Sequence, residues 1–123
     1  MDIDTQTEVE PHTTSQGDIE NGEDWVRLVS NDGFSFLVRR KVANMSGTIG
    51  NSLDPSSSYA ESETKTYHAT NDRGIIVQKL IEYMSFKAHY SKAKGDVPIN
   101  ELMERIPPEI VLEVLLAADY HEL

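Results

Sequence analysis

The sequence predicts an α+β domain in which a small three-stranded sheet packs with helices. Three patterns predict this class: apolar residues alternate on both sides of a glycine-containing turn near residue 33, a helical apolar stripe runs through residues 72–87, and a strongly apolar segment fills residues 110–120. A chain of 123 residues is long enough for one hydrophobic core and too short for two ordinary domains. We therefore expect a single domain.

Charge divides the chain into a leader, residues 1–24, and a domain, residues 25–123. The leader holds eight of the 21 acidic residues and no Lys or Arg, which leaves 13 acids against 11 bases in the domain. Because the leader has little apolar surface to offset the entropy of ordering, we expect it to be disordered and solvated. The domain has no cluster of Lys and Arg for phosphates and no apolar run of the roughly 20 residues that cross a bilayer. Neither a nucleic-acid partner nor a membrane is expected.

The first predicted element is a β-hairpin over residues 25–39. Apolar residues recur at every second position on both sides of the segment Asn31-Asp32-Gly33, and this combination is typical of two antiparallel strands joined by a tight turn. The alternating apolar residues are Val26, Leu28, Phe34, Phe36 and Val38.

The segment after the hairpin predicts a short helix, a loop and a third strand. Ser46 before Gly47 is a helix N-cap, because its side chain can accept a hydrogen bond from a free N–H of the first turn. Pro55 followed by three serines indicates an exposed loop. Residues 64–68 are rich in Thr and Tyr, which favour extended structure, so the third strand is expected there.

The central helix is predicted over residues 72–87, with Asn71-Asp72 as its N-cap. Residues 91–104 interrupt the apolar pattern and predict a surface loop with one helical turn at residues 100–103. The expected core stripe of the helix is Ile76, Leu80, Tyr83 and Met84, with Val77 and Ile81 beside it.

The last helix is predicted to begin at Pro107-Pro108-Glu109, because a proline in the first turn loses no needed N–H and an early acid favours the positive helix end. Residues 110–120 are apolar nearly all round, and a helix with two apolar faces must be covered on both sides. Either a partner or the chain's own sheet and central helix could cover the second face. The first face is Ile110, Val111, Val114, Leu115 and Ala118; the second is Leu112, Leu116, Tyr120 and Leu123.

No pattern of catalytic chemistry is present in the sequence. The absence of cysteine excludes disulfides and thiolate zinc sites, and no phosphate loop, nucleophile elbow or dinucleotide fingerprint occurs. His12, His68, His89 and His121 lie far apart, without metal-ligand spacing, and are expected on the surface. We expect no enzymatic activity, no cofactor or metal, and no small-molecule substrate.

Four segments, in this order, resemble the Elongin C family of adaptors, which has the BTB/POZ-like fold. The segments are Val-Arg-Leu-Val-Ser-Asn-Asp-Gly at residues 26–33, Met-Ser-Gly-Thr-Ile at residues 45–49, Tyr-Met-Ser-Phe-Lys at residues 83–87 and Pro-Glu-Ile-Val-Leu-Glu-Val-Leu-Leu-Ala-Ala-Asp-Tyr at residues 108–120. The last segment resembles the fungal members of the family more than the animal ones.

The resemblance implies a non-enzymatic adaptor that links a BC-box substrate receptor to a cullin in a ubiquitin ligase, in the nucleus and cytoplasm. An Elongin A-like or Elongin B-like protein would be a further partner, as in a transcription elongation factor complex. By position, the implied cullin-binding residues are Ser46, Thr48, Ile49 and Leu53. The implied BC-box pocket is Tyr83, Val114, Leu116, Ala118, Tyr120 and Leu123, with Met103 or Ile106 in place of an aromatic residue expected between residues 91 and 105.

Three other functions stay open. The adaptor of F-box ligases shares the fold, but it continues with two further helices beyond the residue that matches Leu123, so we expect the Elongin C type. A self-associating BTB/POZ scaffold usually carries extra terminal helices, for which the acidic leader is a poor candidate. A small hydrolase or transferase would need a catalytic constellation that the sequence does not offer.

Overall fold

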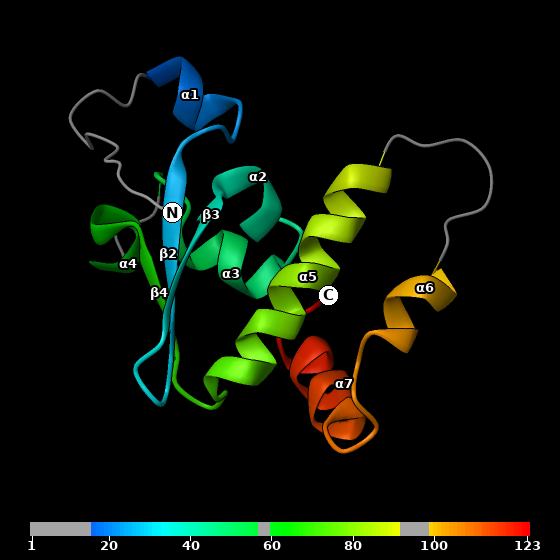
Figure 1. The fold of residues 1–123 in the computed structure, drawn as a ribbon. Coiled ribbons are helices and arrows are strands. Elements are labelled where there is room, and N and C mark those ends of the chain that lie inside the picture. The colour runs from blue at the N-terminus through cyan, green and yellow to red at the C-terminus, as the bar shows by residue number, and fades with distance from the viewer. Residues whose placement is uncertain (1–15, 57–59, 92–98) are drawn as a thin grey trace, which may run out of the picture.

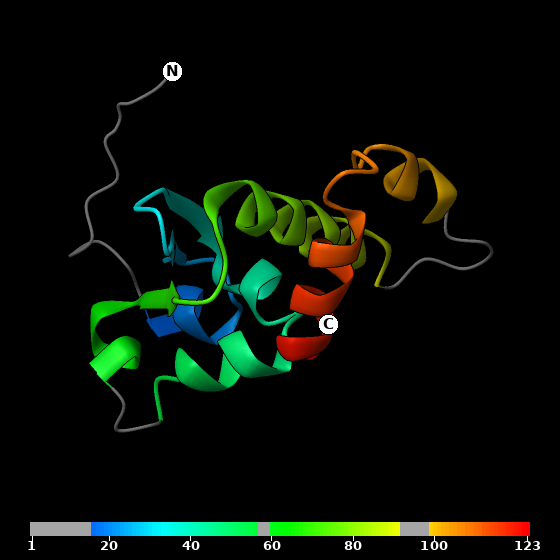
Figure 2. The ribbon, with the colours of Figure 1, turned by 90° about the horizontal axis from the view of Figure 1, so that it is seen from below.

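The computed structural model describes residues 16–56, 60–91 and 99–123, and it shows an α+β fold with one three-stranded sheet, as predicted (Figure 1). Within the described residues, α2, α3 and α5 lie on one side of the sheet and α7 packs against α5 (Figures 1 and 2). The elements are α1 (Gln16–Glu20), β2 (Trp25–Ser30), β3 (Ser35–Arg39), α2 (Arg40–Ala43), α3 (Gly47–Ser52), α4 (Ala60–Thr64), β4 (Thr66–Ala69), α5 (Gly74–Tyr90), α6 (Ile99–Glu104) and α7 (Val111–Tyr120).

The predicted hairpin is confirmed as the antiparallel pair β2 and β3, with Trp25 opposite Arg39 and Arg27 opposite Leu37. Gly33 has a φ of 91°, a conformation that glycine adopts without steric cost, and it closes the turn. Alternate residues of β2 point into the core. Phe34 was expected in the second strand, but it lies in the turn with 60% of its surface exposed.

The third strand is shorter than predicted and begins at Thr66, because residues 60–64 form helix α4. Lys65 separates the two elements with a φ of 56°, and its carbonyl accepts a hydrogen bond of 2.8 Å from the Arg27 N–H. β4 runs parallel to β2 and pairs with it on the side opposite β3, so the chain must pass from one edge of the sheet to the other between β3 and β4. Helices α2, α3 and α4 make that crossover, and sequence propensity alone did not separate α4 from the strand.

Helix α5 supplies the centre of the core with its buried residues Ile76, Val77, Leu80 and Met84. Tyr83, which was also predicted in the core stripe, is only partly buried. The predicted N-cap of α5 is wrong. The helix begins at Gly74, and the Gly74 N–H donates to Oδ1 of Asp32 in the hairpin turn at 2.8 Å. A side chain 42 residues away in sequence therefore takes the place of a local cap.

Asp24 belongs to the domain and not to the leader in which it was predicted. Its carboxylate is fully buried and accepts hydrogen bonds of 3.0 Å from Nε and Nη2 of Arg40, and Nζ of Lys65 lies 2.9 Å from Oδ2. Burial alone would raise the pKa of Asp24, but the hydrogen bonds and charges of Arg40 and Lys65 outweigh it and hold that pKa below its usual value. Residues 16–20 of the predicted leader form α1, and residues 1–15 lie outside the described part.

His121 is buried with 1% of its surface exposed, so its predicted surface location is wrong. Its Nε2 donates to Oδ2 of Asp72 at 2.7 Å, its Nδ1 lies 3.3 Å from the Tyr67 hydroxyl, and its carbonyl accepts from Ser46 Oγ at 2.5 Å. A histidine can be buried when both ring nitrogens have partners. These contacts fasten the end of α7 to β4 and to the start of α3. His68 and His89 are exposed, as predicted, and His12 lies outside the described residues.

Candidate functional site

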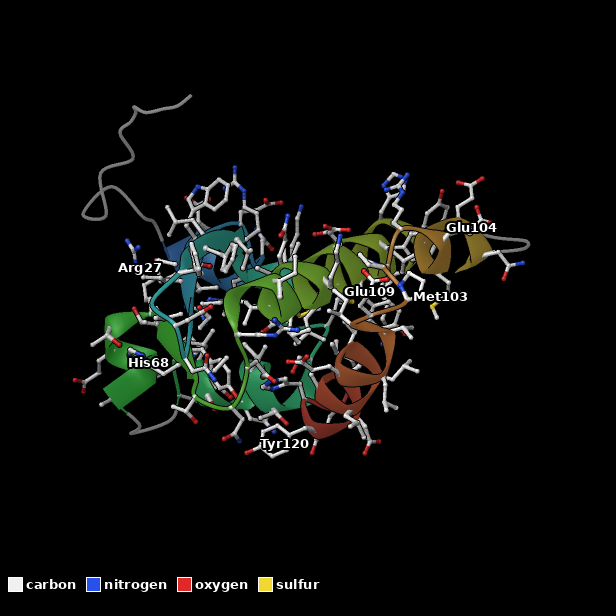
Figure 3. All side chains as sticks on the ribbon, turned by 60° about the horizontal axis from the view of Figure 1, so that its bottom comes forward. Arg27, His68, Met103, Glu104, Glu109 and Tyr120 are labelled. Carbon is white, nitrogen blue, oxygen red and sulfur yellow. The ribbon has the colours of Figure 1, made fainter. Side chains whose placement is uncertain are left out.

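An apolar groove of about 390 Å³ lies where α5, α6 and α7 meet. α5 forms its floor with Leu80, and the side chains of α6 and α7 form its two walls. Figure 3 shows Met103 beside α6 and Tyr120 beside α7. Met103 lines the groove. The lining residues are Leu80, Tyr83, Leu102, Met103, Ile106, Val114, Leu115, Ala118, Asp119 and Leu123.

The groove brings together most of the residues that the sequence assigned to one pocket. Tyr83 and Val114 line it from α5 and α7, although Val114 is only 4% exposed. Ala118 and Leu123, and both candidate substitutes Met103 and Ile106, also line it.

Leu116 and Tyr120 do not line the groove, although both were assigned to it. They stand on the adjoining face of α7, with 64% and 61% of their surfaces exposed. At 100° per residue, these two positions lie about 100° or more away from Leu115 and Ala118 around the helix. Their side chains can therefore contact only a partner that extends beyond the groove.

The outer face of α7 carries a continuous apolar stripe, which we call the α7 ridge: Leu112, Leu115, Leu116 and Tyr120. Each member is between 50% and 67% exposed, and the spacing of three and four residues places them side by side on the helix. Leu115 was expected on the core face but stands at the rim of the groove. A contiguous exposed stripe of large apolar residues beside a groove is typical of a protein-binding surface.

The start of α7 sets the direction of both groove and ridge. The helix begins at Val111, three residues after Pro108, because residues 107–110 form a turn closed by the Ile110 N–H on the Pro107 carbonyl at 3.1 Å. The predicted start at the prolines is therefore too early. Val114 and Ala117 then pack inward against the core, and Ala117 was assigned to neither predicted face.

An ion pair fixes the first turn of α7 against the start of α5. Nη2 and Nε of Arg73 lie 2.9 Å and 3.1 Å from the two carboxylate oxygens of Glu113. The hydrogen bond that Arg73 donates to the Glu113 carboxylate is the main cause that raises the pKa of Arg73. Both side chains are about half exposed, so the pair orients the helix more than it stabilises the fold.

Four groove residues were missed by the pocket assignment: Leu80, Leu102, Leu115 and Asp119. Leu102 lies in α6, a helix of six residues inside a segment predicted mainly as loop. Leu80 was recognised only as a core residue. Among the described residues, Asp119 is the only acidic residue that lines the groove. It lies at one rim, where its carboxylate could accept a hydrogen bond from a bound segment.

Three of the four residues assigned to cullin binding are core residues. Ser46, Ile49 and Leu53 have between 0% and 2% of their surfaces exposed, so their side chains cannot contact a partner. Ser46 instead accepts from the Ile49 N–H at 3.0 Å and thereby caps α3, as predicted. Thr48 alone is partly exposed, and its hydroxyl lies 3.4 Å from the Tyr120 carbonyl.

Within the described residues, no group of three or more His, Cys, Asp or Glu side chains could hold a metal ion. No helix among them is long and apolar enough to span a membrane. The chemistry available at the groove and ridge is apolar contact, with Asp119 and Glu113 as the polar groups nearby.

Comparison with known proteins finds similar curated sequences, among them two described as Elongin-C. The chain is 30% identical over 98 residues to the protein of Dictyostelium discoideum, covering 79% of this chain and 86% of the relative. It is 33% identical over 99 residues to that of Saccharomyces cerevisiae, covering 80% and 95%. No family model matches the chain.

A solved structure of the yeast Rad7 and Elc1 complex contains a similar chain. The match has a TM-score of 0.54 and 27% sequence identity, and it covers 81% of this chain and all of the solved one.

Proposed function

The chain belongs to the Elongin C family, and from this membership we propose that it is a non-enzymatic adaptor that joins a BC-box substrate receptor to a cullin in a ubiquitin ligase. The observation that carries the proposal is the apolar groove with the α7 ridge beside it. A groove with several exposed leucines and one tyrosine suits an amphipathic helix, which buries a few apolar anchors at regular spacing. The similar yeast structure is itself a complex with a second protein, Rad7.

The groove is large enough for one or two apolar anchor side chains of a receptor helix. Full burial of one leucine side chain contributes about 1.5–3 kcal/mol. Tyr83, Leu102 and Ala118 would surround that leucine, and the α7 ridge would receive the following turn of the helix. Leu116 and Tyr120 thus belong to the proposed interface, although they lie outside the groove itself.

The test is the affinity of the full chain for a fluorescent BC-box peptide, measured beside the same peptide with its leading leucine changed to aspartate. We expect the wild-type peptide to bind and the aspartate peptide to bind at least tenfold more weakly, because an unpaired carboxylate would be buried. Equal binding of both peptides, or binding of neither, would refute the proposal.

Protein variants locate the binding site. Ala118→Glu places a charge in the groove and Tyr120→Glu places one on the α7 ridge, so both should weaken binding while the circular dichroism spectrum stays unchanged. The matched control is Leu37→Glu, an apolar residue of β3 with 56% of its surface exposed on the far side of the sheet. If the control weakens binding as much as Ala118→Glu, the groove is not the site.

We propose further that the cullin binds beside α3, through exposed residues and not through the buried Ser46, Ile49 and Leu53. Asn51, Asp54 and Pro55 border a second hollow of about 510 Å³ next to Ser46 and Gly47. The buried Ser46, Ile49 and Leu53 would hold this surface in place from below. Asn51→Arg should abolish binding to a cullin amino-terminal domain in a pull-down and leave BC-box binding unchanged; loss of both would point to misfolding.

As mechanism, we propose that this chain makes and breaks no bond and holds receptor and cullin at a fixed separation. Localisation to nucleus and cytoplasm is part of the same proposal, and imaging of the tagged protein tests it. An Elongin A-like or Elongin B-like partner would co-purify at a fixed stoichiometry. Sedimentation distinguishes the adaptor from a self-associating scaffold. A scaffold would form a tight symmetric dimer through the α7 ridge and would not bind BC-box peptides.

A further inference from the structure

The face of the sheet that points away from α2, α3 and α5 combines basic and apolar side chains, and we call it the outer sheet face. Arg27, Leu37 and His68 are exposed on it, and Trp25 and Val29 are half buried. Figure 3 shows Arg27 and His68 on the same side of the molecule, opposite α6 and α7. The other strand residues that point outward on this face are Arg39, a Ser and a Thr, as the strand register shows. None of the outward strand positions therefore holds an acid.

The two arginines of this face have no carboxylate partner among the described residues. Arg27 donates to Ser35 Oγ at 2.6 Å, and Arg39 donates to the Glu23 carbonyl. The Arg39 guanidinium also lies over the Trp25 ring, 4.1 Å from its centre. Two arginines without carboxylate partners are notable in a chain of net charge −10. An acidic segment would complement this surface.

We propose that the chain's own residues 1–15 fold back and cover the outer sheet face. This segment carries Asp2, Asp4, Glu8 and Glu10, has no Lys or Arg, and adds the apolar Ile3 and Val9, so its charge and composition match the face. The proposal is independent of the groove and of the receptor that would bind there.

The point of attachment supports this occupant. The connection between α1 and β2 is held at the end of the sheet where Trp25 pairs with Arg39, because the Lys41 N–H donates to the Gly22 carbonyl at 2.9 Å and the Arg40 N–H donates to the Asp24 carbonyl at 2.8 Å. Figure 1 shows α1 beside the upper end of β2. A 15-residue segment reaches about 50 Å when extended, whereas six residues of β2 span about 20 Å. The leader can therefore return along the whole face.

Trp25 is the only tryptophan of the chain and stands on this face, so its fluorescence reports the cover directly. The experiment measures quenching of Trp25 by neutral acrylamide in the full chain and in a variant with an uncharged leader. Because exposed ion pairs are individually weak, we expect partial cover and a rise of about twofold in the quenching constant of the variant. The changes are Asp2→Asn, Asp4→Asn, Glu8→Gln and Glu10→Gln.

A matched control removes the same number of charges on the opposite side of the molecule, where Figure 3 shows Glu104 and Glu109 far from Arg27. This control should leave Trp25 quenching unchanged. High salt should raise the quenching constant of the wild-type chain to that of the variant with the uncharged leader. The screening length decreases from about 30 Å at 0.01 M salt to about 3 Å at 1 M salt. The control changes are Glu101→Gln, Glu104→Gln, Glu109→Gln and Asp119→Asn.

Arg27→Gln tests the other half of the contact. It should raise Trp25 quenching as the uncharged leader does, and the two changes together should add little, because both remove one interaction. If neither variant nor salt changes the quenching, the leader does not cover the face and the proposal fails. Quenching that falls with protein concentration would also overturn it, since a second copy would then be the occupant.

Discussion

The buried pair between Asp24 and Arg40 offers the sharpest test of how the amino-terminal end is joined to the domain. The Asp24 side chain is 0% exposed and the Arg40 side chain 5%, and three hydrogen bonds between them are 3.0–3.1 Å long. Removal of one partner from a buried pair costs about 3–5 kcal/mol, because the other charge stays buried without compensation. Since asparagine keeps one acceptor, Asp24→Asn should cost about 3 kcal/mol.

That loss is large enough to measure by thermal unfolding. For a domain of this size each kcal/mol lowers Tm by about 4 °C or more, so we expect a fall of at least about 12 °C. The neighbouring Glu23→Gln is the matched control, because Glu23 pairs with Lys41 through side chains that are 45% and 52% exposed. An exposed pair contributes at most about 0.5 kcal/mol. Equal Tm values for the two variants would refute the claim that Asp24 anchors the domain.

The same pair predicts how stability depends on pH. The pKa of Asp24 is lowered in the folded chain, so its contribution is fully present above the ordinary aspartate pKa of about 3.9 and is lost as pH falls through the folded value. As the pH is lowered below about 5, the stability of the wild-type chain should therefore decrease more steeply than that of the Asp24→Asn variant. Denaturant titrations at several pH values measure this difference, and parallel pH curves would count against the assignment.

Three further substitutions have defined outcomes. Met84→Ala empties a site with 0% exposure and should lower the free energy of unfolding by about 3 kcal/mol in a urea titration, and a loss under about 1 kcal/mol would mean that the core closes over the cavity. Ser46→Ala removes the cap on the Ile49 N–H and the donor to the His121 carbonyl, so a loss of about 2 kcal/mol is expected, whereas the cap alone would account for about 1 kcal/mol. Leu112→Gln, at a residue that is 67% exposed, should change stability by less than about 0.5 kcal/mol and reduce the binding of a hydrophobic dye; a large loss of stability would show that α7 is covered from that side.

Local patterns predicted the elements whose signals lie within a few residues. The hairpin, the core stripe of α5 and the Ser46 cap are all encoded by alternation, helical periodicity or a single capping side chain. Six of the residues that the resemblance to Elongin C assigned to one pocket line the groove. Leu116 and Tyr120 lie outside the groove, because a family position does not fix how far around a helix a side chain points relative to a groove.

Long-range contacts decided the points at which the predictions were wrong. Asp32 caps α5 from another element, and Asp72, the expected cap, instead binds His121. The burial of His121 depends on Tyr67 and Asp72, which are 54 and 49 residues away in sequence. No local pattern in the chain distinguishes such a histidine from an exposed one.

The sequence by itself determined the α+β class, the amino-terminal acidity, and a last helix with more apolar surface than one core can cover, because composition and periodicity are local properties. Only the tertiary structure decided which apolar residues of that helix are core, which line the groove and which form the α7 ridge. The same residue types occupy all three places, and their burial depends on where α5 and α6 lie against α7. That arrangement is a property of the packed chain and cannot be derived from any one segment.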